Sequence, residues 1–142
     1  KLMVRKGFVK SFDEAFDRYL GKGKPAYVDK VRIESIHAIE LINAAGGVPV
    51  LAHPCLLELE SAEQLDELLQ EMMSMGLKGL EVYYPQHSPE QIRQYTDLAR
   101  RHDLLMTGCT DFHGDILPEI QMGFGKGDFC VPYALYEKLI ER

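Results

Sequence analysis

The chain has 142 residues, and its 46% hydrophobic content is sufficient to build a packed core, which argues against a disordered protein. Its 22 acidic and 16 basic residues give a net charge of −6, which argues against non-specific binding to a long nucleic acid. No apolar run approaches the roughly 20 residues that are needed to span a bilayer, so no membrane association is expected.

The cysteines and the first residues indicate a cytoplasmic protein. Cys55, Cys109 and Cys130 form no C-x-x-C pair, and their odd number favours reduced thiols over a disulfide framework. No charged segment followed by an apolar run opens the chain, so no secretory signal is predicted. The chain begins at Lys1 without an initiator Met, and we therefore expect it to be part of a longer protein.

Residues 1–30 predict a short helix and a loop. Ser11 and Glu14 form a capping box that begins a helix, which continues through Phe16 and ends at Gly21. The glycines that follow, together with Pro25, predict a turn.

From residue 31 onwards, short apolar runs alternate with helical patterns, which is typical of βα units on a parallel sheet. Three strands are expected, over residues 48–52, 79–83 and 104–107. Four further helices are expected, over about 32–45, from 61 to 76, over about 88–102, and from Pro132 to the end. The glycine-rich stretch 123–129 predicts a loop. The sequence thus predicts an α/β fold with three strands and five helices.

Polar residues stand at the end of each predicted strand, where the apolar pattern does not require them. His53 follows the first strand; Glu81 lies in the second, with His87 just beyond it; Asp111 and His113 follow the third. The carboxyl ends of parallel strands in βα architectures meet at one mouth, where substrates and metals bind. All five side chains could therefore face the same cavity.

Asp111 and His113 give the sharpest local signal. Residues two apart in an extended backbone point to the same side, so this carboxylate and this imidazole could bind one metal ion or two neighbouring ions. Carboxylate and imidazole ligands suit manganese, iron or zinc, whereas cysteine thiolates favour softer metal ions. The structural alternative is a chance D-x-H triplet whose Asp caps a turn.

The other polar residues also have structural alternatives. His53 could be a loop histidine before the turn-forming Pro54. Glu81 could orient a ligand or a substrate, or it could face solvent or pair with a lysine. His87 precedes a predicted helix N-terminus, where it could bind phosphate or donate a proton, or it could be a surface loop histidine. Their shared location at the ends of predicted buried strands favours the functional interpretation.

Three motifs resemble those of the PHP (polymerase and histidinol phosphatase) family: GGVPVLAHP at 46–54, GLEVYY at 79–84 and TGCTDFHG at 107–114. The stretch 11–28 is similar to the segment that bridges the two halves of the family members that act on small nucleotides. The resemblance implies that residues 31–142 are the C-terminal half of an irregular seven-stranded βα barrel. Residues 1–30 would be a bridging segment from an inserted region.

The resemblance further implies a metal-dependent phosphoesterase. His53, Asp111 and His113 would be metal ligands in a site for two or three divalent ions, which would be manganese, iron or zinc. From their positions in and after the second strand, we expect His87 and Glu81 to be catalytic residues. The reaction would be hydrolysis of a phosphate ester in a small phosphorylated substrate, with small nucleotides or short oligonucleotides favoured. A histidinol-phosphatase-like phosphatase and a non-catalytic PHP-fold interaction module are the alternatives.

The sequence departs from the family pattern in two respects. Cys109 and Thr110 stand where a small Gly or Ser pair is usual. The N-terminal H-x-H pair of the family and its further His and acidic ligands have no counterpart upstream of Ser11. We therefore expect the chain alone to bind metal weakly and to be inactive or nearly so. We also expect an exposed sheet edge, normally covered by the missing N-terminal half, through which the chain could self-associate.

Overall fold

The computed structural model describes residues 1–29, 31–114, 120–123 and 129–141. The chain divides into two compact units, unit 1 (Lys1–Ile33) and unit 2 (Glu34–Arg142). The division expected from the sequence, between residues 30 and 31, lies close to this boundary. The assignment of the two parts to a bridging segment and a barrel half stays a prediction.

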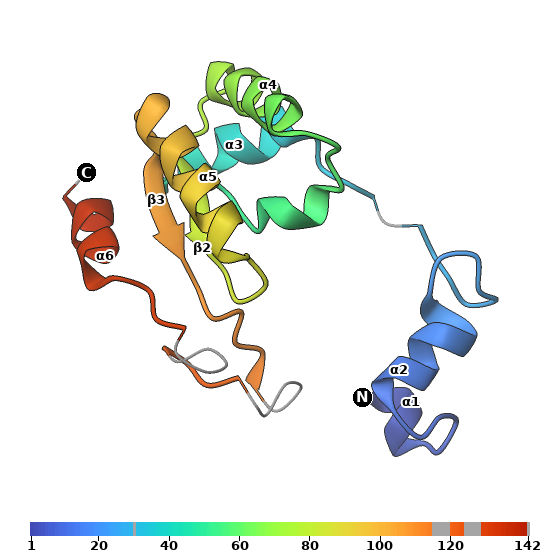
Figure 1. Ribbon diagram of the computed structural model, residues 1–142. Helices are drawn as coiled ribbons and strands as arrows, with labels where there is room; N and C mark the ends of the chain where they lie inside the picture. Colours follow the sequence, from blue (N-terminus) through green and yellow to red (C-terminus); the bar gives the residue numbers. More distant parts are fainter. Residues whose placement is uncertain (30, 115–119, 124–128, 142) are drawn as a thin grey trace. The chain divides into compact units, whose positions relative to one another are not determined.

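Unit 1 consists of three short helical elements (Figure 1): α1 (Leu2–Arg5), α2 (Phe12–Ala15) and the π-helix η1 (Phe16–Leu20). The hydroxyl oxygen of Ser11 accepts a hydrogen bond from the backbone N–H of Glu14 at 3.1 Å, so the predicted N-terminus of the helix is confirmed. The last five residues of the predicted helix are wound as a π-helix, and α1 was not predicted. Only Val9 and Ala15 are buried hydrophobic residues in the described part of this unit.

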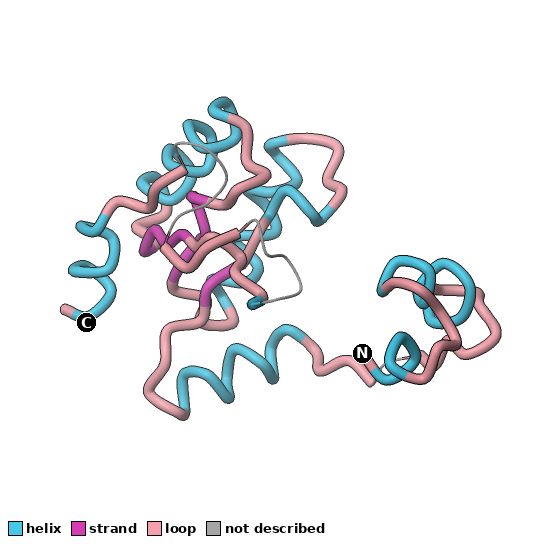
Figure 2. Tube along the Cα trace, turned by 90° about the horizontal axis from the view of Figure 1, so that it is seen from below, coloured by secondary structure: helices cyan, strands magenta, loops and turns pink. Residues whose placement is uncertain are grey.

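Unit 2 is built on a parallel sheet of three strands in the order β1 (Val50–Leu51), β2 (Gly79–Tyr83), β3 (Leu105–Gly108). Figure 2 shows the three strands in magenta with the helices around them. The predicted α/β fold is therefore confirmed at the level of a three-stranded parallel sheet. The central strand β2 is buried along most of its length, as expected for a strand that is covered on both faces.

The first strand is shorter than predicted, because only Val50 and Leu51 pair with β2. Pro49 has no N–H to donate to a ladder, and its carbonyl oxygen instead accepts hydrogen bonds from the backbone of Lys78 and Gly79 at 3.0 and 3.1 Å. The third strand begins one residue later than predicted, since the N–H of Leu104 still bonds to the preceding helix.

The helices of unit 2 begin at residues that can cap them. Ser61 caps α4 (Ala62–Ser74), and Ser88 caps α5 (Pro89–Arg101) with the complete capping box that the sequence predicts. The helix α3 (Ser35–Ala44) begins three residues later than expected, and α6 (Tyr133–Ile140) begins after Pro132 as predicted. A 3₁₀ helix, η2 (Pro54–Leu57), was not predicted.

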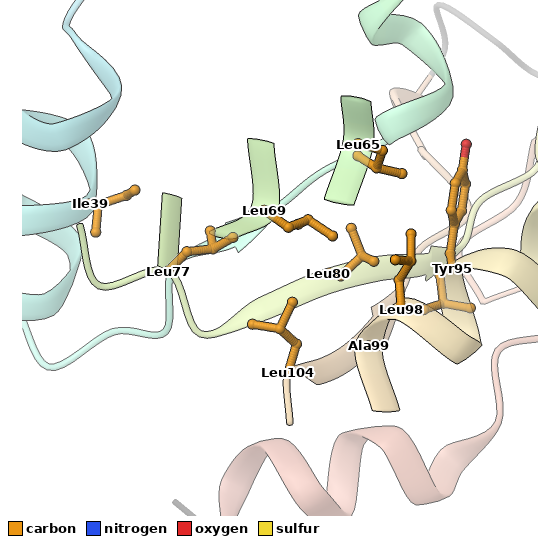
Figure 3. Close-up of a cluster of buried hydrophobic side chains, with 10 residues drawn as sticks. Ile39, Leu65, Leu69, Leu77, Leu80, Tyr95, Leu98, Ala99 and Leu104 are labelled. Atoms are coloured by element: carbon orange, nitrogen blue, oxygen red, sulfur yellow. The ribbon is translucent and has the colours of Figure 1, made fainter. Parts of the chain in front are cut away.

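The hydrophobic core lies within unit 2, where α4 and α5 meet the sheet (Figure 3). Leu69 of α4, Leu80 and Val82 of β2 and Ala99 of α5 are completely buried there. The glycine-rich stretch predicted to be a loop lies largely outside the described residues, at 124–128. No helix among the described residues has the length and apolar character to cross a membrane.

Candidate active site

An irregularity where β2 meets β3 shapes the carboxyl end of the sheet. Glu81 pairs with Thr107, but the next pair is Tyr83 with Gly108, so the register shifts between them. A Cβ atom at position 108 would lie 2.5 Å from the Cβ of Tyr83, and therefore only glycine fits this close approach. The chain then leaves the sheet directly into Thr110 and Asp111.

Glu81 holds the backbone of His53. Its carboxylate accepts a hydrogen bond from the backbone N–H of His53 at 2.7 Å, and the Glu81 side chain is buried. His53 has a left-handed backbone conformation with φ 31° and ψ 62°. This conformation is uncommon for residues other than glycine, so the hydrogen bond stabilises a turn that the chain would otherwise avoid. The interpretation of Glu81 as a solvent-facing strand residue is wrong.

Tyr84 connects the first and third strand ends. Its hydroxyl donates a hydrogen bond to the Oδ2 atom of Asp111 at 3.2 Å, and its ring centroid lies 5.5 Å from that of His53. Burial, together with the nearby carboxylate of Asp111, raises the pKa of Tyr84 to about 12, so the phenol keeps its proton and remains a donor. Asp111 also has a left-handed backbone, with φ 54°. Sequence reasoning missed Tyr84, although a polar-tipped aromatic directly after a buried strand was a usable signal.

His87 is a buried neutral imidazole. Its Nδ1 atom lies 2.8 Å from the carbonyl oxygen of Val82, so Nδ1 carries the hydrogen and Nε2 presents a lone pair. Nε2 is buried and has no hydrogen-bond partner among the described residues, and the rings of Tyr84 and Tyr95 pack against the imidazole. Burial lowers the pKa of His87. The interpretation as a surface loop histidine is wrong, and the neutral form accepts protons rather than donates them.

His113 is more exposed than the other candidate residues. Its Nδ1 atom lies 2.7 Å from the backbone oxygen of Asp111, and the same atom lies 3.6 Å from the Asp111 carboxylate. An imidazole whose N–H bonds to a carbonyl keeps its other nitrogen available for a metal, and this is the usual arrangement of metal-binding histidines.

The described residues provide suitable metal ligands but no closed metal site. Asp111 and His113 supply a carboxylate and an imidazole that lie close together. His53 lies nearby, because its ring packs against Tyr84, whose hydroxyl bonds to Asp111. This donor set fits a divalent transition metal. Within residues 1–29, 31–114, 120–123 and 129–141, however, no three His, Cys, Asp or Glu side chains converge closely enough to hold an ion.

Comparison with known proteins identifies the family. No family model matches the chain. It is 34% identical over 123 residues to the 5'-3' exoribonuclease Rnm of Escherichia coli, covering 87% of this chain and 41% of that protein. It is 32% identical over 111 residues to the 3',5'-nucleoside bisphosphate phosphatase of Chromobacterium violaceum, covering 78% and 39%. The chain belongs to the PHP family. It spans about 40% of the length of these curated PHP relatives.

Solved structures agree with this assignment to the PHP family. A protein from Bifidobacterium adolescentis, described as a candidate metal-dependent phosphoesterase, matches with a TM-score of 0.74 and 29% identity over 97% of this chain and 46% of that one. An amidohydrolase from Chromobacterium violaceum, solved with sulfate and without metal, matches with a TM-score of 0.66 and 28% identity over 98% and 48%. The fold of this chain therefore corresponds to about half of each of these structures.

Proposed function

We propose that this chain is the C-terminal part of a PHP barrel and supplies part of a metal-dependent phosphoesterase site for nucleotides or short RNA. Two curated relatives that it matches are, by name, an exoribonuclease and a nucleoside bisphosphate phosphatase. The resemblance to the PHP family places the remaining metal ligands in the N-terminal half, and the described residues of this chain gather no complete set.

The observation that carries the proposal is the hydrogen-bonded frame at the carboxyl end of the sheet. The Glu81 carboxylate binds the backbone of His53, and the Tyr84 hydroxyl binds the carboxylate of Asp111. Two candidate ligands are thereby fixed from the ends of different strands, by partners that are themselves buried. A frame of this kind preorganises ligands, whereas a purely structural sheet end has no need of it.

In this site His53, Asp111 and His113 would hold divalent ions, with manganese, iron and zinc as the candidates. When bound, such ions polarise phosphate oxygens and lower the pKa of a water so that it can attack. The Glu81 carboxylate acts by orienting His53. His87 would act from a buried position, because its neutral imidazole has a free Nε2 lone pair that would accept a proton or a hydrogen bond from a water enclosed in the site.

The test uses the whole protein that contains this chain, purified with manganese. Hydrolysis is measured for a 3',5'-nucleoside bisphosphate, a 5'-phosphorylated short RNA and histidinol phosphate. In Asp111→Asn we expect kcat/KM to fall by more than the roughly 10- to 100-fold that is typical of losing an outer-shell partner. The matched control is Asp97→Asn, because Asp97 is an exposed aspartate on α5.

Full activity in Asp111→Asn would contradict the assignment of the site. A wild-type protein that hydrolyses none of the esters but binds another protein would favour the non-catalytic module. Hydrolysis of histidinol phosphate without hydrolysis of either nucleotide substrate would exclude nucleotides as the substrate class. We expect the 142-residue chain alone, assayed in parallel, to show little or no turnover.

A further inference from the structure

The net charge of the chain is divided very unevenly between its two units. Unit 1 contains nine Lys and Arg residues and four Asp and Glu residues, so its formal charge is +5. Unit 2 contains seven basic and eighteen acidic residues, so its formal charge is −11. The value of −6 for the whole chain is therefore a sum of two opposite charges and describes neither unit. The electrostatic attraction for a polyanion therefore differs between the two units.

The cations of unit 1 are exposed, and most of them have no acidic partner. Arg18 forms an ion pair with Glu14 at 2.6 Å and lies over the ring of Tyr19. In the described part of the unit, no other lysine or arginine side chain lies within ion-pair distance of a carboxylate. These exposed residues are Lys1, Arg5, Lys6, Lys10, Lys22, Lys24 and Arg32. Their charge is available to an external anion.

Exposed aromatic side chains lie among these cations. Phe8, Phe12 and Phe16 expose 64%, 38% and 57% of their surface, and Lys6 and Lys10, which have no acidic partner, lie on either side of Phe8 in the sequence. Unpaired cations interspersed with exposed aromatic rings are the surface that single-stranded nucleic acids bind. The cations contact phosphates, and the rings stack on bases. A purely apolar partner would not require the charge.

We propose that unit 1 binds the phosphate backbone of a short single-stranded oligonucleotide. This proposal rests on the proposed function, because it makes an oligonucleotide rather than a mononucleotide the substrate class. Unit 2, with its charge of −11, repels such a polyanion wherever bound metal does not offset that charge. Unit 1 therefore supplies the electrostatic attraction. Its small size limits the contact to a few nucleotides, so a long nucleic acid is not implied.

The test measures binding without turnover. The affinity of the 142-residue chain for a fluorescein-labelled RNA pentamer is determined by fluorescence anisotropy in EDTA, as a function of salt. The variant is Lys22→Glu with Lys24→Glu, in the exposed loop after η1. The control is Lys78→Glu with Lys138→Glu, two exposed lysines of unit 2. Both variants change the net charge of the chain equally, so any difference between them reports location.

For the wild type we expect affinity to fall with salt, with a logarithmic slope of about −0.7 for each phosphate contact. In the unit 1 variant we expect at least tenfold weaker binding at low salt and a slope shallower by about 1.4, which corresponds to two lost contacts. The control should bind within about twofold of the wild type. Circular dichroism confirms that both variants are folded.

Three results would overturn the proposal: no binding of the pentamer at low salt, equal weakening in both variants, or equal affinity for an inorganic polyphosphate of the same charge. The last result would show a general polyanion site. Because EDTA removes the metals, failure here is distinct from failure of the phosphoesterase proposal. That proposal is tested by turnover in Asp111→Asn.

Discussion

Two residues of the candidate site, His53 and Asp111, leave their strands in the left-handed region of backbone conformation. Outside glycine this region is sparsely populated, although His and Asp enter it more readily than most residues. Each is held by a buried partner, His53 by Glu81 and Asp111 by Tyr84. Strain that is maintained by buried hydrogen bonds is typical of functional sites, because a relaxed turn would aim the ligands elsewhere.

Replacing Tyr84 by Phe tests this frame at the level of one atom. The ring keeps its packing against His53 and His87, but Asp111 loses its donor. We expect the manganese affinity of the whole protein, measured by calorimetric titration, to fall by roughly 10- to 100-fold. The free energy of unfolding should fall by only about 1 kcal/mol, the value of one hydrogen bond. The control is Tyr136→Phe on α6, which is exposed.

A merely structural role of Tyr84 would lower stability and leave metal affinity unchanged. That result would remove Tyr84 from the site.

At this scale the sequence predicts candidate ligands but not the residues that support them. His53, Asp111 and His113 were recognisable because each follows a strand that apolar residues already define. The bonds from Glu81 and Tyr84 join residues 28 and 27 positions apart, and such contacts depend on the register between strands. These pairings form only when the strands assemble through their long crossovers, so a short stretch of sequence around either residue does not show them.

The residues at the ends of the helices and strands around the site determine where these elements begin and stop. The α5 helix begins directly after His87, and the Ser88 hydroxyl accepts a hydrogen bond from the N–H of Gln91 at 3.2 Å. The Gln91 side chain in return accepts one from the N–H of Ser88 at 2.9 Å. This capping box fixes the start of α5, and it therefore also fixes the end of the loop between β2 and α5 that contains His87.

We expect Ser88→Ala to lower the free energy of unfolding by about 1 kcal/mol, because the N–H of Gln91 loses its acceptor. Urea denaturation followed by circular dichroism measures this change. Ser74→Ala is the matched control, since the Ser74 hydroxyl bonds only to the carbonyl oxygen of Glu71 on an exposed helix surface. Equal effects in both variants would show that the cap contributes nothing specific.

Helix starts were predictable from sequence because caps are local chemistry, and the Ser11, Ser61 and Ser88 caps all lie where expected. Strand ends were less predictable. Pro49 lacks an N–H, and the first residues of the apolar run 48–52 therefore do not pair as strand. The register shift opposite Gly108 depends on the pairing of β2 with β3. Apolar pattern shows which residues are buried, but backbone hydrogen bonding decides which of them form strand.

For the whole molecule, the stabilising contacts are as unevenly divided as the charge. Every residue of the main core cluster, from Ile39 to Leu104, belongs to unit 2. Unit 1 has 33 residues, fewer than the roughly 40 below which a chain usually needs a disulfide, a metal or a partner to fold. Unit 1 contributes no residue to that cluster, and its charge of +5 is consistent with the binding role that we propose for it.

Residues 34–142 produced alone should keep the stability of the whole chain. Since the core cluster is complete without residues 1–33, we expect the free energy of unfolding to agree within about 1 kcal/mol, against the roughly 5–15 kcal/mol typical of a domain. Urea denaturation by circular dichroism and by tyrosine fluorescence measures it. A peptide of residues 1–33 should show little helix under the same conditions. A large loss of stability in 34–142 would mean that unit 1 is part of the folding unit, and its cations would then have to be explained within that packing.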